Sequence, residues 1–144
     1  LLDLPATVEH LQPLGVPIIG LATKQLPAFF SQESGLILGQ TAADIDQAAK
    51  IITTRRSLKR PGGEILAVPV PDHAALPWTD VQEWVSKAST EADQKRLTGS
   101  LITPFILQRL RELSSGQTLN ANIALIENNA SIAGRLAINL ASYT

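Results

Sequence analysis

Residues 16–23 read Val-Pro-Ile-Ile-Gly-Leu-Ala-Thr, a short apolar run with turn-forming residues at its edges. Such a run predicts a buried strand, and Pro17 stands at its start, where a missing N–H is tolerated. Residues 63–71, Gly-Glu-Ile-Leu-Ala-Val-Pro-Val-Pro, predict a second buried strand that ends at its prolines. Two buried strands among helical segments predict an α/β fold. Because two strands make a poor sheet alone, we expect the remaining strands to come from outside this chain.

The helices are expected to start at residues whose side chains can cap a helix. The expected N-caps are Asp3, Thr41, Thr79 and Thr103, with capping boxes at 41–44 and 79–82. The helix after Thr41 has one apolar stripe, Ile45, Ala48, Ala49 and Ile52. Residues 24–40, which carry an adjacent aromatic pair, and residues 91–100 are expected to be loops. A last long helix is expected at about 119–141, with a small-residue stripe for close packing at Ile126, Ala130, Ala133 and Ala137.

Length and composition exclude several classes of protein. The 144 residues fit one domain, and 12 Lys+Arg against 13 Asp+Glu argue against non-specific binding of nucleic acid. No run approaches 18 consecutive apolar residues, so no membrane span is expected. The absence of cysteine excludes disulfides, thiolate metal sites and a cysteine nucleophile. With His10 and His73 as the only histidines, a histidine-rich metal site is excluded as well.

The sequence contains no methionine. Since a primary translation product begins with Met, we expect this chain to be processed, cut or part of something longer. Its first residues do not resemble a signal peptide, because no basic region precedes a long apolar stretch.

Asparagines in the last helix are the main candidates for a binding site. Asn is a poor helix former because its side chain competes for backbone hydrogen bonds. Asn122 and Asn129 are seven residues apart and therefore share a face of the helix. Their amides either satisfy nearby backbone groups or recognise a polar, planar ligand, since an amide offers a donor and an acceptor. The pattern alone leaves both interpretations open and favours the first.

Several short motifs occur in the order found in one known family. They are residues 15–20 (Gly-Val-Pro-Ile-Ile-Gly), Thr23 with residues 26–30 (Leu-Pro-Ala-Phe-Phe), Ser34-Gly35, residues 69–71 (Pro-Val-Pro), residues 103–105 (Thr-Pro-Phe), residues 120–125 (Asn-Ala-Asn-Ile-Ala-Leu) and residues 128–130 (Asn-Asn-Ala). Over nearly its whole length, the sequence resembles the pseudouridine-5'-phosphate glycosidases, also called the indigoidine synthase A family.

The resemblance implies that residues 1–144 are the C-terminal portion of a single layered α/β/α domain. The whole protein would be about twice as long, usually a homotrimer, and cytoplasmic. Its reaction would be the reversible cleavage of the C–C glycosidic bond of pseudouridine 5'-phosphate to uracil and ribose 5-phosphate. The implied partners are the N-terminal half, further copies of the protein and this small-molecule substrate, with no nucleic acid and no membrane.

In the family, a lysine forms a Schiff base with the ring-opened sugar, a glutamate moves protons, and an aspartate holds a divalent metal, typically Mn²⁺, through water. The resemblance places all three upstream of Leu1, so no catalytic residue and no metal ligand is expected in this chain. Lys24 is no substitute, because it matches the stretch before Pro27. Asn122 matches the asparagine that binds the uracil-like base. Thr103 and Asn129 match motif positions with a supporting role.

Two positions depart from the family pattern. Val68 stands where the family often has Asn, and Ser100 stands where it often has Lys. A non-catalytic subunit or pseudoenzyme that acts by binding is therefore the alternative to an active glycosidase.

Overall fold

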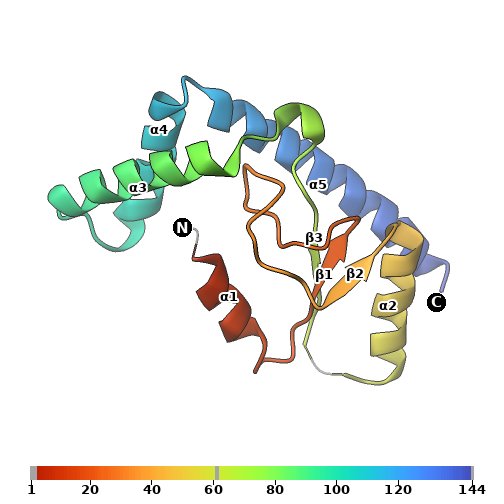
Figure 1. Cartoon of the computed structure of the whole chain (residues 1–144). Coiled ribbons are helices and arrows are strands. Elements are labelled where there is room, and N and C mark those ends of the chain that lie inside the picture. Colours follow the sequence, from red (N-terminus) through yellow and green to blue (C-terminus); the bar gives the residue numbers. More distant parts are fainter. Residues whose placement is uncertain (1–2, 61, 144) are drawn as a thin grey trace.

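The computed structural model describes residues 3–60 and 62–143 (Figure 1). Its first half contains helices and strands, and its second half is helical. The elements are α1 (Leu4–Leu11), β1 (Ile18–Leu21), β2 (Gln40–Ala42), α2 (Ile45–Ser57), β3 (Ile65–Ala67), α3 (Trp78–Gln94), α4 (Ile102–Leu113) and α5 (Gln117–Ala141), with 3₁₀ turns at Asp72–Ala74 and Gly99–Leu101.

The three strands form a parallel sheet in the order β2-β1-β3. Gly20 in the central strand pairs with Thr41 on one side and Ala67 on the other. Only a glycine fits there, because an added Cβ would lie 2.3 Å from the carbonyl oxygen of Thr23. The predicted α/β fold is confirmed, and both predicted strands form, as β1 and β3. The prediction that the second strand is buried is wrong for most of it, because Ile65 is exposed and only Ala67 is buried.

The third strand, β2, lies where the sequence predicted the start of a helix. Thr41 is paired with Gly20 and does not cap α2, so that N-cap prediction is wrong. The N-cap is Asp44, whose carboxylate accepts a 2.8 Å hydrogen bond from the Gln47 backbone N–H. The Gln47 side chain accepts in turn from the Ala43 N–H at 2.7 Å. A reciprocal cap therefore exists three residues later than predicted, because strand pairing holds the earlier residues extended.

Two further helix starts differ from the prediction. α3 begins at Trp78 after Pro77, and α4 begins at Ile102 after a 3₁₀ turn, so Thr79 and Thr103 lie inside the first helical turns. α3 also continues to Gln94, through part of the expected loop at 91–100. Its last turns bury Ala92, and this tertiary contact outweighs the polar local sequence.

Two clusters of buried side chains form the interior. The sheet core consists of Ile19, Ala42, Ala48 and Ile52, against which Leu136 and Leu140 of α5 pack. The helix core consists of Phe30, Val81, Ala88, Ile106, Leu110 and Ala121. Figure 1 shows α5 extending from α4 to α2, so this helix contributes to both clusters.

The expected small-residue stripe of α5 is not packed within this chain. Ile126 is 59% exposed, and Ala130, Ala133 and Ala137 are exposed as well. The helix instead buries Ala121 and Leu125. Within residues 3–60 and 62–143, no helix combines the length and apolarity that crossing a membrane requires.

Candidate functional site

A cavity of about 820 Å³ lies where the end of α4 meets the start of α5. We call it the helix cavity. Its lining includes Phe30, Leu107, Gln108, Arg111, Thr118 and Asn122. Phe30 comes from the loop after β1, so the cavity joins residues that are far apart in the sequence. Several amide and hydroxyl groups beside apolar side chains suit a ligand that has both apolar and polar surfaces.

Asn122 stands in this cavity one helical turn after Thr118. Thr118 is buried, its backbone N–H donates to the Ser114 hydroxyl at 3.1 Å, and the two hydroxyls lie 3.0 Å apart. These bonds fix the start of α5 and with it the position of Asn122. The Asn122 side chain is half-buried, and it makes no hydrogen bond within the part of the chain that the structure describes. Its donor and acceptor are therefore available to a ligand.

Phe30 is held in place by a tight turn and by hydrogen bonds to the segment after β3. The Ala28 N–H donates to the Ser31 carbonyl at 2.8 Å, and the Ser31 N–H donates back to Ala28 at 3.3 Å. The buried Ser31 hydroxyl donates to the Leu76 carbonyl at 2.7 Å, while the Leu76 N–H donates to the Phe30 carbonyl at 2.8 Å. This arrangement fixes the position of Phe30, whose side chain is almost fully buried beside the helix cavity.

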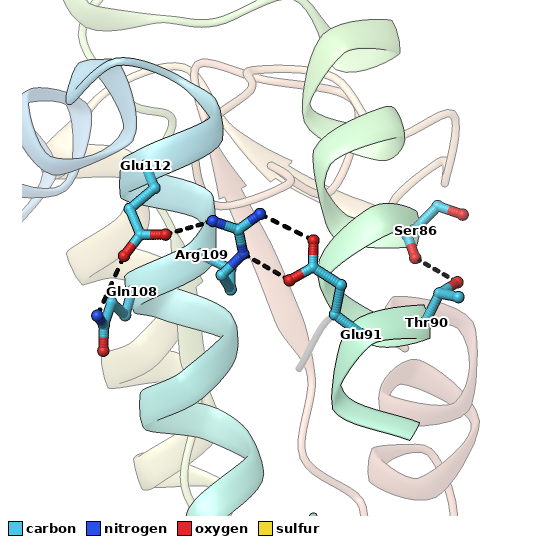
Figure 2. Close-up of polar contacts among 6 residues, drawn as sticks. All are labelled: Ser86, Thr90, Glu91, Gln108, Arg109 and Glu112. Carbon is cyan, nitrogen blue, oxygen red and sulfur yellow. Dashed lines mark hydrogen bonds and ion pairs between the residues drawn. The ribbon is translucent and has the colours of Figure 1, made fainter. Parts of the chain in front are cut away.

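An ion-pair network joins α3 to α4 beside the same cavity (Figure 2). Arg109 donates two hydrogen bonds of 2.6 and 2.8 Å to Glu91 of α3 and another to Glu112 on its own helix. Gln108 also donates to Glu112, at 3.1 Å. The hydrogen bonds from Arg109 lower the pKa of both glutamates, so both carboxylates stay ionised at neutral pH. The network acts as a clamp between the helices.

A second cavity, of about 540 Å³, lies at the carboxyl ends of β1 and β3, and we call it the strand-end cavity. Its lining includes Thr23, Lys24, Gln32, Val68, Asp72 and Asn128. The Asn128 amide donates to the Pro69 carbonyl at 3.4 Å, and the Gln32 amide donates to Val70 and Asp72 at 3.0 and 2.6 Å. Ligands of open α/β sheets bind at this edge, outside the carboxyl ends of the strands.

The three predicted site residues do not meet in one cavity. Asn122 lines the helix cavity. Thr103 is exposed in the first turn of α4, whereas the cavity contacts the last turns of that helix. Asn129 is exposed on α5 and lines neither cavity. Its neighbour Asn128, which sequence reasoning passed over, is the one that contacts the segment after β3.

The two positions that depart from the family pattern lie in different parts of the structure. Val68 lines the strand-end cavity, while Ser100 is exposed in the 3₁₀ turn before α4, outside the linings of both cavities. Across the part of the chain that the structure describes, no cluster of three or more His, Cys, Asp or Glu side chains is arranged to hold a metal ion.

Residues 1–139 match the family described as indigoidine synthase A like protein. This chain belongs to that family. It is 42% identical over 142 residues to a pseudouridine-5'-phosphate glycosidase of Paracoccus denitrificans, covering 99% of this chain and 47% of the relative. It is 39% identical over 140 residues to one of Caldanaerobacter subterraneus, covering 97% and 46%. This member of the indigoidine synthase A-like family thus spans about half the length of the curated relatives it matches.

Two solved structures share its fold. The prealnumycin C-glycosynthase AlnA, in complex with ribulose 5-phosphate, has a TM-score of 0.89 and 26% identity, and the match covers 98% of this chain and 46% of AlnA. An indigoidine synthase A-like protein from Thermotoga maritima has a TM-score of 0.83 and 31% identity over 96% of this chain and 45% of its own. The resemblance read from the sequence motifs is confirmed.

Proposed function

We propose that this chain is the C-terminal part of a pseudouridine-5'-phosphate glycosidase, which reversibly cleaves the C–C bond between base and sugar to give uracil and ribose 5-phosphate. The observation that carries the proposal is the 39–42% identity, over 97–99% of the chain, to relatives that bear this name. The structural likeness to AlnA supports the same chemistry, because that protein is a C-glycosynthase and its structure holds a pentulose phosphate.

The catalytic lysine, the glutamate and the aspartate that holds Mn²⁺ would be supplied by residues upstream of Leu1. A lysine Schiff base suits a C-glycoside, because the iminium acts as an electron sink for a bond that has no ordinary leaving atom. The metal would lie outside residues 1–144, because the resemblance places its aspartate upstream of Leu1. The working protein would be a homotrimer in the cytoplasm.

This chain's own contribution would be recognition of the base. Asn122 can donate to a carbonyl of uracil through its N–H and accept from a ring N–H through its oxygen. Both atoms lie in the helix cavity without a partner among the described residues. Thr103 and Asn129 would have supporting roles outside this cavity.

The test measures uracil release from pseudouridine 5'-phosphate in the presence of Mn²⁺. The full-length protein that carries this chain is compared with residues 1–144 alone. We expect turnover by the full-length protein and none by the 144-residue chain. A folded full-length protein that releases no uracil would contradict the proposal.

The alternative is a pseudoenzyme that binds the same substrate without cleaving it. Val68 favours this alternative, because it places an apolar side chain in the strand-end cavity where the family often has an amide. Equilibrium binding of pseudouridine 5'-phosphate separates the two cases. A pseudoenzyme binds without releasing uracil, whereas Val68→Asn would raise the turnover of an active but impaired enzyme.

A further inference from the structure

Helix α5 carries a second apolar face, which no part of the described chain covers. Its apolar residues recur at intervals of four and three residues and therefore lie on one side of the helix. They are Leu119, Ile123, Ile126, Ala130, Ala133 and Ala137, and we call this set the outer stripe. All six are exposed, and Ile126 reaches 59%. A Cβ added at the neighbouring Gly134 would have open space around it.

The outer stripe differs from the two other sides of α5. One side packs within this chain through Ala121, Leu125 and Leu136. Another side is polar and exposed, with Asn120, Glu127, Ser131 and Arg135. A surface helix has one apolar side, whereas a helix that is apolar on several sides belongs to the interior of a larger protein. The pattern of α5 is that of a helix between two layers, and the described chain supplies one of them.

The sheet lacks neighbours as well. Parallel sheets occur with both faces covered. Among the described residues, the outer strands β2 and β3 pair only with β1. Ile65 of β3 is 39% exposed, which is unusual for an isoleucine in a parallel sheet. Two separate parts of this chain, the sheet and α5, therefore offer apolar surface to a further layer.

The length of the relatives indicates what this layer is. This chain spans about half the length of the relatives and solved structures that it matches, so a segment of similar size belongs to the same polypeptide there. A stable complex of separate chains buries roughly 800 Å² of each partner. The outer stripe offers less, since three of its six side chains are alanines. A segment of the same polypeptide needs a smaller surface, because no translational freedom of a separate partner is lost.

We propose that the outer stripe is the surface on which the upstream half of the same polypeptide packs. This inference rests on the proposed function, which makes residues 1–144 the C-terminal part of a longer protein. The partner surface is apolar, because a charged group opposite Ile123 and Ile126 would be buried without an ion pair. The alanines at 130, 133 and 137 let a helix of that half approach α5 closely.

This packing has a consequence for the helix cavity. Leu119 belongs to the outer stripe and also lines the cavity, so the stripe begins at the cavity. Asn122 stands one helical turn before Ile126. A segment that covers the outer stripe therefore reaches the edge of the cavity and brings its own side chains beside the Asn122 amide. The base would be enclosed by both halves of the protein.

The experiment measures how fast a maleimide reacts with a single cysteine in the native full-length protein. Residues 1–144 contain no cysteine, and any cysteine upstream is replaced by serine. Ala130→Cys places a thiol on the outer stripe, and the control Ser131→Cys places one on the polar side of the same turn. We expect the thiol of Ala130→Cys to react at least about tenfold more slowly, and both to react equally in guanidinium chloride. Equal rates in the native protein would overturn the inference.

A lysine at the same position separates the upstream half from a second copy of the protein. If the upstream half covers the stripe, Ala130→Lys buries an unpaired charge, so the Tm falls by several degrees while the oligomeric state stays the same. Ser131→Lys should change neither quantity. A change of oligomeric state in Ala130→Lys, measured by light scattering, would assign the stripe to a contact between copies and overturn the inference. The cysteine variants decide the question if the lysine variant does not fold.

The failure of this inference can be told from the failure of the proposed function, because neither readout depends on activity. An active protein in which the two cysteine variants react equally overturns the inference alone. A full-length protein that releases no uracil but protects the thiol of Ala130→Cys overturns the proposed activity and supports the inference. A native protein with the mass of residues 1–144 alone overturns both.

Discussion

The sheet core and the helix core are built from different side chains, although α5 passes through both. The sheet core combines Ile19 and Ile52 with the alanines Ala42 and Ala48, whose small side chains let α2 lie close to the strands. The helix core contains Phe30 and Leu110, with Trp78, Trp84 and Phe105 packed against it. Large side chains of irregular shape leave hollows where helices meet, and the helix cavity lies there.

This difference separates scaffold from recognition. The sheet core fixes the strands, whose carboxyl ends carry the loop with Phe30 and the segment with Pro69. The helix core positions Asn122 and surrounds Phe30. Besides α5, which runs through both cores, polar contacts of Ser31, Gln32 and Asn128 connect the two regions. The following variants test how independent the two regions are.

The largest effect is expected from truncation in the helix core. Leu110 is fully buried, so Leu110→Ala in the full-length protein should lower the free energy of unfolding by about 2–5 kcal/mol. Chemical denaturation measures this change. The control is Leu107→Ala on the same helix, at a position 39% exposed, where a much smaller loss is expected. Equal losses at both positions would show that the helix core is not packed as described.

The next effect concerns activity rather than stability. Asn122→Ala removes both hydrogen bonds to the base, and we expect kcat/KM for pseudouridine 5'-phosphate to fall about 10- to 100-fold at unchanged Tm. Asn120→Ala is the matched control, because Asn120 is exposed two residues earlier and lines neither cavity. Wild-type turnover in Asn122→Ala would remove the role assigned to this side chain.

The local sequence identified β1 and β3 but not β2. Residues around Ile19 and Leu66 are isoleucine, leucine and other apolar residues, so the strands show in the sequence. Gln40-Thr41-Ala42 is short and partly polar, and it is extended because it pairs with β1. The local pattern around Thr41 instead resembles a helix start. Pairing with a strand that is distant in the sequence determines that this segment is extended, and no local pattern contains that information.

Only part of the candidate site could be predicted from the sequence. Asn122 was identified through the motifs, but its cavity depends on Phe30, which lies 92 positions earlier in the chain and meets α5 only in the folded state. Asn128 left a usable signal. It follows Ala121 and Leu125 at helical spacing, and so falls on the buried face of α5, where an amide needs a partner. The exposed Asn129 does not fall on this buried face.

A smaller effect on stability is expected where the two regions meet. Asn128→Ala removes the hydrogen bond to the Pro69 carbonyl and should cost about 0.5–1.5 kcal/mol. Asn129→Ala corrects for the higher helix propensity of alanine, since Asn129 is exposed on the same helix. Denaturant unfolding of both variants gives the difference between their free energies of unfolding. If Asn128→Ala is as stable as Asn129→Ala, the contact contributes nothing to joining the regions.

The smallest effect is a pH dependence within the helical region. Arg109→Ala removes the clamp between α3 and α4 shown in Figure 2. The pKa of Glu91 and of Glu112 is lowered from the ordinary 4.5 by hydrogen bonds from Arg109. The contribution of the clamp is therefore fully present above about pH 4.5, and it is lost as the pH falls through the lowered folded pKa.

Thermal unfolding between pH 3 and pH 7 checks this expectation. The Tm of Arg109→Ala should lie a few degrees below that of the wild type at pH 7, and the gap should narrow below pH 4.5. Arg111→Ala is the control on the same helix, because the Arg111 side chain makes no ion pair among residues 3–60 and 62–143. It should show a gap that does not depend on pH. A gap for Arg109→Ala that persists unchanged at pH 3 would mean that the arginine acts through packing of its aliphatic stem and not through the two carboxylates.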